Sequence, residues 1–170
     1  GSGKTTFVDL LSGFLNPDEG EILCDNSNIK NNQGSWKQLI GYVPQSIFLT
    51  DDTIKNNICL GVEKDSINFE ALNKSIEKAQ LKKLIKDLPD GLDTIVGDRG
   101  IGLSLGQIQR IGIARALYWQ KPIIIFDEST NSLDSQNEKE IINVIRELRN
   151  NKTIIFISHD LDLLKSCDKI

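Results

Sequence analysis

The first residues of the chain have the types and the order that bind phosphate. They are Gly1, Ser2, Gly3, Lys4, Thr5 and Thr6. Apolar residues with a helical period follow them, at Phe7, Leu10, Leu11 and Phe14. The hexamer therefore lies at the N-terminus of an expected helix, where unpaired N–H groups and the helix dipole favour an anion. Lys4 adds a point charge for the β- and γ-phosphates of a nucleotide, and the Thr5 hydroxyl can bind Mg²⁺.

The hexamer matches only the second half of a complete phosphate-binding motif. The first glycine of that motif, and the strand that leads into it, would precede Gly1. We therefore expect the chain to be a fragment of a longer protein, cut inside the loop. The alternative is a Gly/Ser turn with a solvated lysine, which suits the hexamer alone but not the motifs that follow it.

Length and composition suit one α/β domain with a core of its own. The 170 residues are 39% hydrophobic and 26% charged, and the formal net charge is −4. This acidic balance gives no electrostatic basis for nucleic-acid binding. The three cysteines, at positions 24, 59 and 167, lack metal-ligand spacing and indicate reduced thiols in a cytosolic setting. No apolar run reaches the length that spans a bilayer.

Two stretches near the ends of the chain predict an α/β core. In the first, we expect a short strand at Glu21–Asp25, a polar loop at 26–34 and a second strand at Leu39–Val43. In the last third, continuous apolar runs at Pro122–Phe126 and Thr153–Ile157 are typical of buried parallel strands.

Between these stretches the pattern changes to helices. Asp52 or Thr53 can cap one helix, and Ser104 with Gln107 forms a capping-box pattern that opens another. We therefore expect a helical insertion that begins after Gln45 and ends before the last third of the chain.

Asp127 and Glu128 directly follow the apolar run that ends at Phe126. Because ligands of open parallel sheets bind beyond the carboxyl ends of the strands, both acids should emerge beside the phosphate-binding loop. Asp127 can hold Mg²⁺ through its water shell, and Glu128 can polarise a water that attacks the γ-phosphate. The alternative is that the two acids merely end a strand and face solvent.

The order of motifs along the chain resembles that of the nucleotide-binding domain of an ATP-binding cassette (ABC) transporter. Residues 103–107, Leu-Ser-Leu-Gly-Gln, resemble the signature motif, which reads Leu-Ser-Gly-Gly-Gln in most members. The other motifs follow the family's order: Walker A at Gly1–Thr6, the Q-loop at Gln45, Walker B at Ile123–Asp127, the catalytic glutamate at Glu128, the D-loop at Ser132–Asp134 and the switch histidine at His159.

The resemblance implies a fold and a division of the chain. The fold would be an α/β P-loop NTPase (RecA-like) core with a mainly parallel sheet, plus an inserted α-helical subdomain. Residues 1–45 and 121–170 would form the core, and residues from about 46 to 120 would form the helical subdomain with the signature motif. Residues 1–170 would then be one ABC ATPase domain that lacks its N-terminal part.

The resemblance also implies ATP and Mg²⁺ as ligands. The residues expected to bind ATP are Gly1, Ser2, Gly3, Lys4, Thr5, Thr6, Gln45, Ser104, Gly106, Gln107 and Asp134. Those expected to bind the metal are Thr5, Gln45 and Asp127. Those expected to support hydrolysis are Lys4, Glu128 and His159.

In this family two cassettes close head to tail, so Ser104 and Gly106 would face the ATP that Lys4 of a second cassette holds. For several of these residues a purely structural role remains an alternative. Ser104 can be a simple helix cap, His159 a structural histidine and Gln45 a surface side chain. Asp134 fits a helix cap as well as it fits an interface residue.

The chain departs from the family pattern at two positions. Leu105 stands where most members have glycine, and its side chain either weakens the contact with the partner's phosphate or points away from it. Asp160 follows the histidine, where exporters usually have arginine. Because Lys4, Asp127, Glu128 and His159 are all present, we expect an active ATPase.

Residues 42–58 and Val96–Gly100 resemble the exporter type, in which a transmembrane domain precedes the cassette in the same chain. Residues 36–52 and 114–118 also resemble bacterial flippases for lipid-linked oligosaccharides. We therefore expect a cassette at the cytoplasmic face of a membrane, a bacterial inner membrane, that couples ATP hydrolysis to movement of a substrate. Its partners would be a second cassette, identical or not, and a transmembrane domain, with no nucleic acid.

Two other classes of protein share parts of this pattern. A soluble ABC ATPase that acts on DNA or ribosomes would have the same catalytic residues, but it would also need a basic patch. A regulatory cassette that only binds ATP is favoured by Leu105 and disfavoured by Glu128 and His159. About six apolar spans before Gly1 would separate a transporter from a soluble protein.

Overall fold

The computed structural model describes residues 3–129, 135–149, 151–158, 164 and 167–170. Within these residues, the central sheet has three parallel strands in the order β3 (Ile40–Val43), β6 (Ile123–Asp127) and β7 (Thr153–Ile157). The middle strand β6 is the buried apolar run, in which β-branched isoleucines fit a pleated surface that is covered on both faces. The α/β class with a parallel sheet, expected from the sequence, is confirmed.

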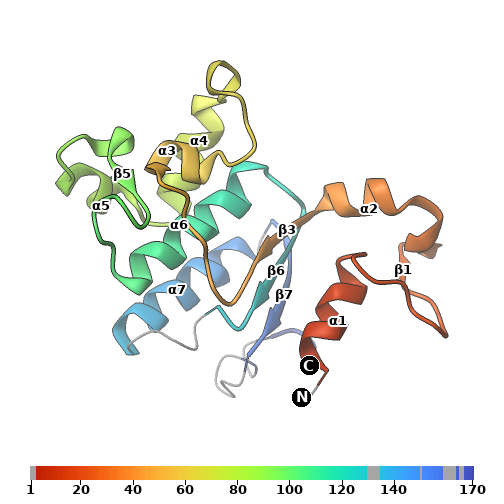
Figure 1. Ribbon diagram of the computed structural model, residues 1–170. Coiled ribbons are helices and arrows are strands. Elements are labelled where there is room, and N and C mark those ends of the chain that lie inside the picture. Colours follow the sequence, from red (N-terminus) through yellow and green to blue (C-terminus); the bar gives the residue numbers. More distant parts are fainter. Residues whose placement is uncertain (1–2, 130–134, 150, 159–163, 165–166) are drawn as a thin grey trace.

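Helices lie on both sides of this sheet (Figure 1). α1 (Lys4–Leu11) is on one side, and α6 (Leu105–Tyr118) and α7 (Ser135–Leu148) are on the other. Ile124 and Ile125 of β6, which point to opposite faces of the sheet, are both fully buried as a result. This arrangement leaves the carboxyl end of each strand as the edge from which polar side chains can emerge.

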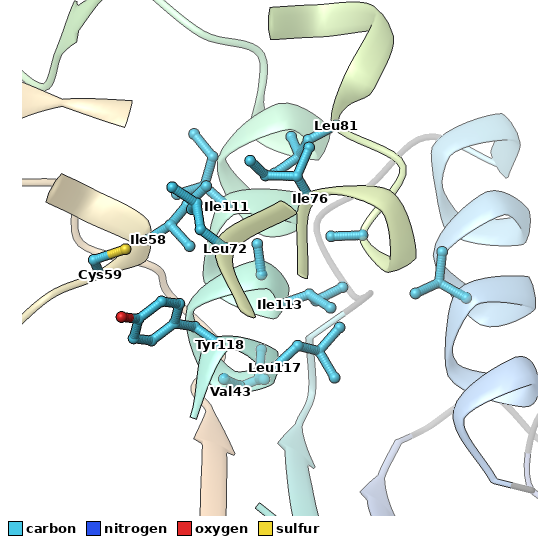
Figure 2. Packing of buried hydrophobic residues seen from close by; sticks show 14 of the residues in the cluster. Val43, Ile58, Cys59, Leu72, Ile76, Leu81, Ile111, Ile113, Leu117 and Tyr118 are labelled. Carbon is cyan, nitrogen blue, oxygen red and sulfur yellow. The ribbon is translucent and has the colours of Figure 1, made fainter. Parts of the chain in front are cut away.

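Short elements gather around α6 in the middle of the chain. They are β4 (Asp52–Thr53), α3 (Ile54–Ile58), a 3₁₀ turn (Lys64–Ser66), α4 (Phe69–Lys78), α5 (Lys82–Asp87), a 3₁₀ turn (Gly91–Asp93) and β5 (Ile95–Val96), which pairs antiparallel with β4. Figure 2 shows Ile58, Leu72 and Ile111, from α3, α4 and α6, in one buried apolar cluster. Thr53 caps α3 through its side chain, one of the two caps that the sequence allowed.

The apolar stripe expected on the first helix is wrong. The buried residue of α1 is Val8, whereas Phe7 is 56% exposed and Phe14 is 66% exposed. The helix ends at Leu11 because Gly13 takes a left-handed conformation, with φ of 72°. Phe14 therefore lies beyond the helix and cannot extend its stripe.

The polar loop expected at residues 26–34 is also wrong. This part of the chain contains β2 (Ser27–Asn28), which pairs with β1 (Leu23–Cys24), then a 3₁₀ turn (Ile29–Asn32) and the start of α2 (Gln33–Leu39). Polar residues here act as helix caps, and the side chain of Asn32 accepts from the Ser35 N–H. The buried Trp36 then anchors α2 by donating from Nε1 to the Leu11 carbonyl at 2.8 Å.

The segment between β3 and α3 packs against α6 through one apolar contact and through hydrogen bonds from Arg115. Ile47 lies against Gly112, where an added Cβ would come within 2.3 Å of the isoleucine Cδ1. Arg115 donates to the carbonyl of Phe48 at 3.0 Å and to that of Asn57 at 2.8 Å. Burial lowers the pKa of Arg115, and these carbonyl acceptors replace the water that the guanidinium loses.

The side chain of Asn57 also holds this segment in place. It is fully buried, its Oδ1 accepts from the Thr50 N–H at 2.9 Å, and its Nδ2 donates to the carbonyls of Thr50 and Thr53 at 3.0 and 3.1 Å. One amide therefore fixes the backbone of the stretch directly before α3. The stretch that follows β3 and the helix α6 are thus held as one packed unit.

Within the described residues, no helix combines the length and apolar character needed to cross a membrane.

The contact between Ile47 and Gly112 predicts the sign of a substitution. Alanine in place of glycine in a helix normally adds about 1 kcal/mol to the free energy of unfolding. Here the new methyl group would overlap Ile47, and overpacking of this kind costs about 1–3 kcal/mol. We expect Gly112→Ala to lower the free energy of unfolding, measured by denaturant titration.

The control is the double variant Ile47→Ala/Gly112→Ala, compared with Ile47→Ala alone. With the isoleucine side chain removed, the alanine at position 112 should become neutral or stabilising. If Gly112→Ala stabilises the protein with Ile47 in place, the close contact does not exist in solution.

Candidate active site

Glu128 follows the last residue of β6 in a backbone conformation that is uncommon for a side chain other than glycine. Its φ is 46°, and its N–H donates to the Ile157 carbonyl at the end of β7, at 2.9 Å. A left-handed residue costs about 1 kcal/mol or more and persists where its surroundings fix it. Here the hydrogen bond to β7 fixes the conformation of Glu128. As a result, the chain turns at Glu128, and its side chain does not continue the alternation of β6.

The carboxylate of Glu128 joins two segments that are far apart in the sequence. Its Oε1 forms an ion pair with Lys4 Nζ at 2.5 Å, and its Oε2 accepts from Gln45 Nε2 at 3.2 Å. The Glu128 side chain is only 13% exposed, whereas that of Lys4 is 32% exposed. The structure therefore brings together the lysine of the phosphate-binding loop, the glutamine after β3 and the acid after β6.

Asp127, at the end of β6, has a different partner. The Tyr42 hydroxyl of β3 donates to its Oδ2 at 3.0 Å. Burial raises the pKa of Tyr42 to about 12, and the carboxylate of Asp127 adds to the rise, so the phenol keeps its proton and remains a donor at neutral pH. Sequence reasoning did not assign Tyr42 to the site.

The helix α1 begins directly after Gly3, so Lys4, Thr5 and Thr6 lie on its first turn. Gly3 is the N-cap residue with φ of 76°, and no side chain of the described residues caps the helix through a hydrogen bond. Thr5 and Thr6 are exposed on the first helical turn. Among the described residues, no side-chain cap therefore occupies the first N–H groups of α1, the kind of group that binds anions at helix N-termini.

The donor set suits Mg²⁺ in the way that nucleotide sites usually hold it. The expected ligands Thr5, Gln45 and Asp127 offer a hydroxyl, an amide oxygen and a carboxylate, all of which are hard oxygen donors. Among the described residues, no group of three or more acidic, histidine or cysteine side chains converges on one point. Mg²⁺ bound through one carboxylate, waters and substrate phosphates does not require such a group.

Ser104, Gly106 and Gln107 lie elsewhere, at the start of α6. Ser104 and Gln107 form the expected capping box, in which the Ser104 N–H donates to Gln107 Oε1 at 2.8 Å and the Gln107 N–H donates to Ser104 Oγ at 3.3 Å. Leu105 is half exposed beside them. Figure 1 places this end of α6 on the far side of the molecule from α1, so the structure does not bring these residues to Lys4.

Gly106 has a packing reason to be glycine. A Cβ at this position would come 2.9 Å from the side chain of Asn137 in α7. The start of α6 therefore lies directly on α7. The other expected site residues, Gly1, Ser2, Asp134 and His159, lie outside the described residues.

Comparisons with known proteins bear on the family and the fold of the chain. A family model described as ABC transporter matches residues 1–131. The whole chain is similar to an ATP-dependent lipid A-core flippase of Idiomarina loihiensis, with 41% identity over 100% of the chain and 29% of the relative. It is also 41% identical to ABC transporter B family member 6 of Dictyostelium discoideum, again over 100% of the chain but 25% of the relative.

A solved structure is similar as well. It is that of a bacterial Atm1-family ABC exporter with ATP bound, at a TM-score of 0.86 and 37% identity, over 98% of this chain and 29% of that one. The chain thus spans 29% or less of the length of these relatives.

The capping box predicts a measurable contribution of Ser104 to stability. Replacing the serine by alanine removes the acceptor of the Gln107 N–H, and loss of a helix cap costs about 1 kcal/mol. We expect Ser104→Ala to lower the free energy of unfolding by about this amount, measured by denaturant titration. Ser104→Asp, which retains a capping oxygen, should remain close to the unsubstituted protein, and equal losses in both variants would contradict the role of the cap.

Proposed function

Because the chain belongs to the ABC transporter family, we propose that it is the ATP-binding and hydrolysing cassette of a membrane exporter of the flippase kind. The observation that carries this proposal is the position of Glu128 between Lys4 and Gln45, at the carboxyl edge of a parallel sheet. An acid, a phosphate-binding lysine and a polar amide at one point are the groups that phosphoryl transfer to water requires.

Lys4 and the first N–H groups of α1 bind the phosphates in this mechanism. The ammonium group, now paired with Glu128, turns to the β- and γ-phosphates, and Gly1, Ser2, Gly3, Thr5 and Thr6 complete the loop. Thr5, Gln45 and Asp127 hold Mg²⁺ with the nucleotide. When bound, the ion neutralises charge on the phosphate oxygens.

Glu128 is the general base of the reaction. Its carboxylate accepts the proton of the water that attacks the γ-phosphorus, while the bond from that phosphorus to the bridging oxygen of ADP breaks. Gln45 already donates to the same carboxylate and keeps it oriented. His159 is assigned to hold the attacking water and the γ-phosphate.

A second cassette supplies the other half of the site. The start of α6 lies across the molecule from α1, and we assign Ser104, Gly106 and Gln107 to the nucleotide held by a partner cassette. The start of a capped helix offers N–H groups to phosphate, as α1 does. Asp134 belongs to the same interface.

The wider setting follows from the relatives. Two of them are named as an ATP-dependent flippase and an ABC exporter, and each is more than three times as long as this chain. We assign a transmembrane domain to the same full-length protein and place the cassette at the cytoplasmic face of a membrane, the inner membrane of a bacterium. Residues from about 46 to 120 act as a helical subdomain that transmits closure from the core of residues 1–45 and 121–170 to the membrane helices.

The role of Glu128 can be tested by removing its charge. In the full-length protein, Glu128→Gln should retain ATP binding, because the loop and Lys4 are intact. It should lower ATP turnover by about a hundredfold or more, the usual contribution of a general base. The same substitution at Glu70, an exposed residue of α4 paired with Lys74, is the control and should leave turnover unchanged. Unchanged turnover in Glu128→Gln would remove this residue from its role.

The composite site predicts that two defective cassettes complement each other. Lys4→Ala removes the phosphate-binding charge, and Ser104→Asp keeps the helix cap but places a negative charge against the partner's phosphate. Mixed dimers carry both defects in one site and none in the other. Random mixing should therefore leave about a quarter of the sites intact, measured as ATP retained after gel filtration. No gain over either variant alone would contradict head-to-tail pairing.

A further inference from the structure

Tyr42 is the one tyrosine of the sheet, and its hydroxyl reaches the acid at the end of the neighbouring strand. In the register of β3 and β6, Tyr42 lies opposite Ile125, two residues before Asp127. Because side chains alternate along a strand, Tyr42, Ile125 and Asp127 point to the same face of the sheet. The long tyrosine side chain spans the two-residue offset and donates to Asp127 Oδ2 at 3.0 Å.

The neighbours of this hydroxyl fix the direction of the hydrogen bond. The partner of the Tyr42 hydroxyl is a carboxylate oxygen of Asp127, which offers it an acceptor. A protonated phenol beside a carboxylate donates to it. This leaves the second oxygen of the Asp127 carboxylate available for another partner.

We propose that Tyr42 is a positioning residue, which orients the Asp127 carboxylate so that its other oxygen faces the metal bound with ATP. The inference rests on the proposed function, because it requires Asp127 to serve a metal site.

The physical need for such a residue comes from the aspartate side chain. The terminal torsion of a carboxylate has broad minima, so a carboxylate at the end of a strand samples many orientations. A single donor to Oδ2 selects one plane and one free oxygen. Groups that orient a ligand in this way tune metal affinity without touching the metal.

The competing explanation is that the aromatic ring alone matters. Tyr42 is 37% exposed, so most of the surface of its ring is buried against the protein. In that case phenylalanine would serve equally well, because it retains the ring and lacks only the hydroxyl. The substitution Tyr42→Phe therefore separates the two explanations with little risk to the fold.

The experiment compares Tyr42→Phe with a matched variant in the full-length protein. Tyr118→Phe removes the only other tyrosine hydroxyl of the chain, which accepts from the Asn68 N–H in the helical region. For each protein, ATP hydrolysis is measured against free Mg²⁺, and binding of Mn²⁺ is measured by electron paramagnetic resonance with a non-hydrolysable ATP analogue. Binding of the same analogue in excess chelator gives the metal-free affinity.

We expect Tyr42→Phe to raise the concentrations of Mg²⁺ and Mn²⁺ needed for half-saturation by about tenfold, the scale of one hydrogen bond to a charged group. Turnover at saturating Mg²⁺ and metal-free nucleotide affinity should both stay within about twofold of the unsubstituted protein. Tyr118→Phe should lower the melting temperature and leave the metal dependence unchanged.

Three outcomes would overturn the inference in distinguishable ways. If the unsubstituted protein does not hydrolyse ATP, the proposed function fails and the inference fails with it. If that protein is active and Tyr42→Phe shows the same metal dependence, the hydroxyl does not position Asp127. If metal-free and metal-loaded nucleotide binding weaken equally, Tyr42 contacts the nucleotide and not the metal ligand.

Discussion

Parallel pairing of β6 with a neighbour on each side decides where Gln45, Asp127 and Glu128 emerge. Each strand runs in the same direction, so the side chains that follow β3 and β6 leave the sheet at one edge. The hydrogen bond from the Glu128 N–H to the Ile157 carbonyl extends this pairing one residue beyond the strand. It also holds Glu128 in the left-handed conformation that directs its carboxylate to Lys4.

The helix α6 connects this edge to the rest of the molecule. On the sheet side, Gly41 of β3 lies so close to α6 that an added Cβ would be 3.2 Å from the Ala116 carbonyl. On the opposite side α6 packs against α3 and α4. Gly112 and Arg115 then bind the stretch that follows Gln45. One helix thus contacts the sheet, the segment that follows the site glutamine and the surrounding helices.

Local features of the sequence predicted local structure well. The parallel strands β6 and β7, the Thr53 cap and the Ser104–Gln107 capping box depend on residues a few positions apart, and the structure contains them. Only β6 is buried as expected, because β7 has one exposed and four partly buried residues. The apolar stripe on α1 failed at Phe14, because Gly13 ends the helix earlier than the hydrophobic period suggests, and it also failed at Phe7, which lies within the helix and is exposed. The contact of Tyr42 with Asp127 joins residues that are 85 positions apart, and it follows only from the register of two strands, which no local pattern encodes.

The ion pair of Lys4 with Glu128 would couple phosphate binding to the position of Glu128. Charge-assisted contacts of this kind are among the strongest that a side chain makes, and Oε1 of the acid and phosphate oxygens would compete for the same ammonium group. In the proposed function, arrival of the triphosphate therefore weakens the hold of Lys4 on Glu128, whereas Gln45 still donates to Oε2. The carboxylate and the amide must then move together. Because the stretch after Gln45 is packed onto α6 through Ile47, Phe48 and Arg115, exchange of one anion for another at Lys4 acts on the helix that begins with Ser104.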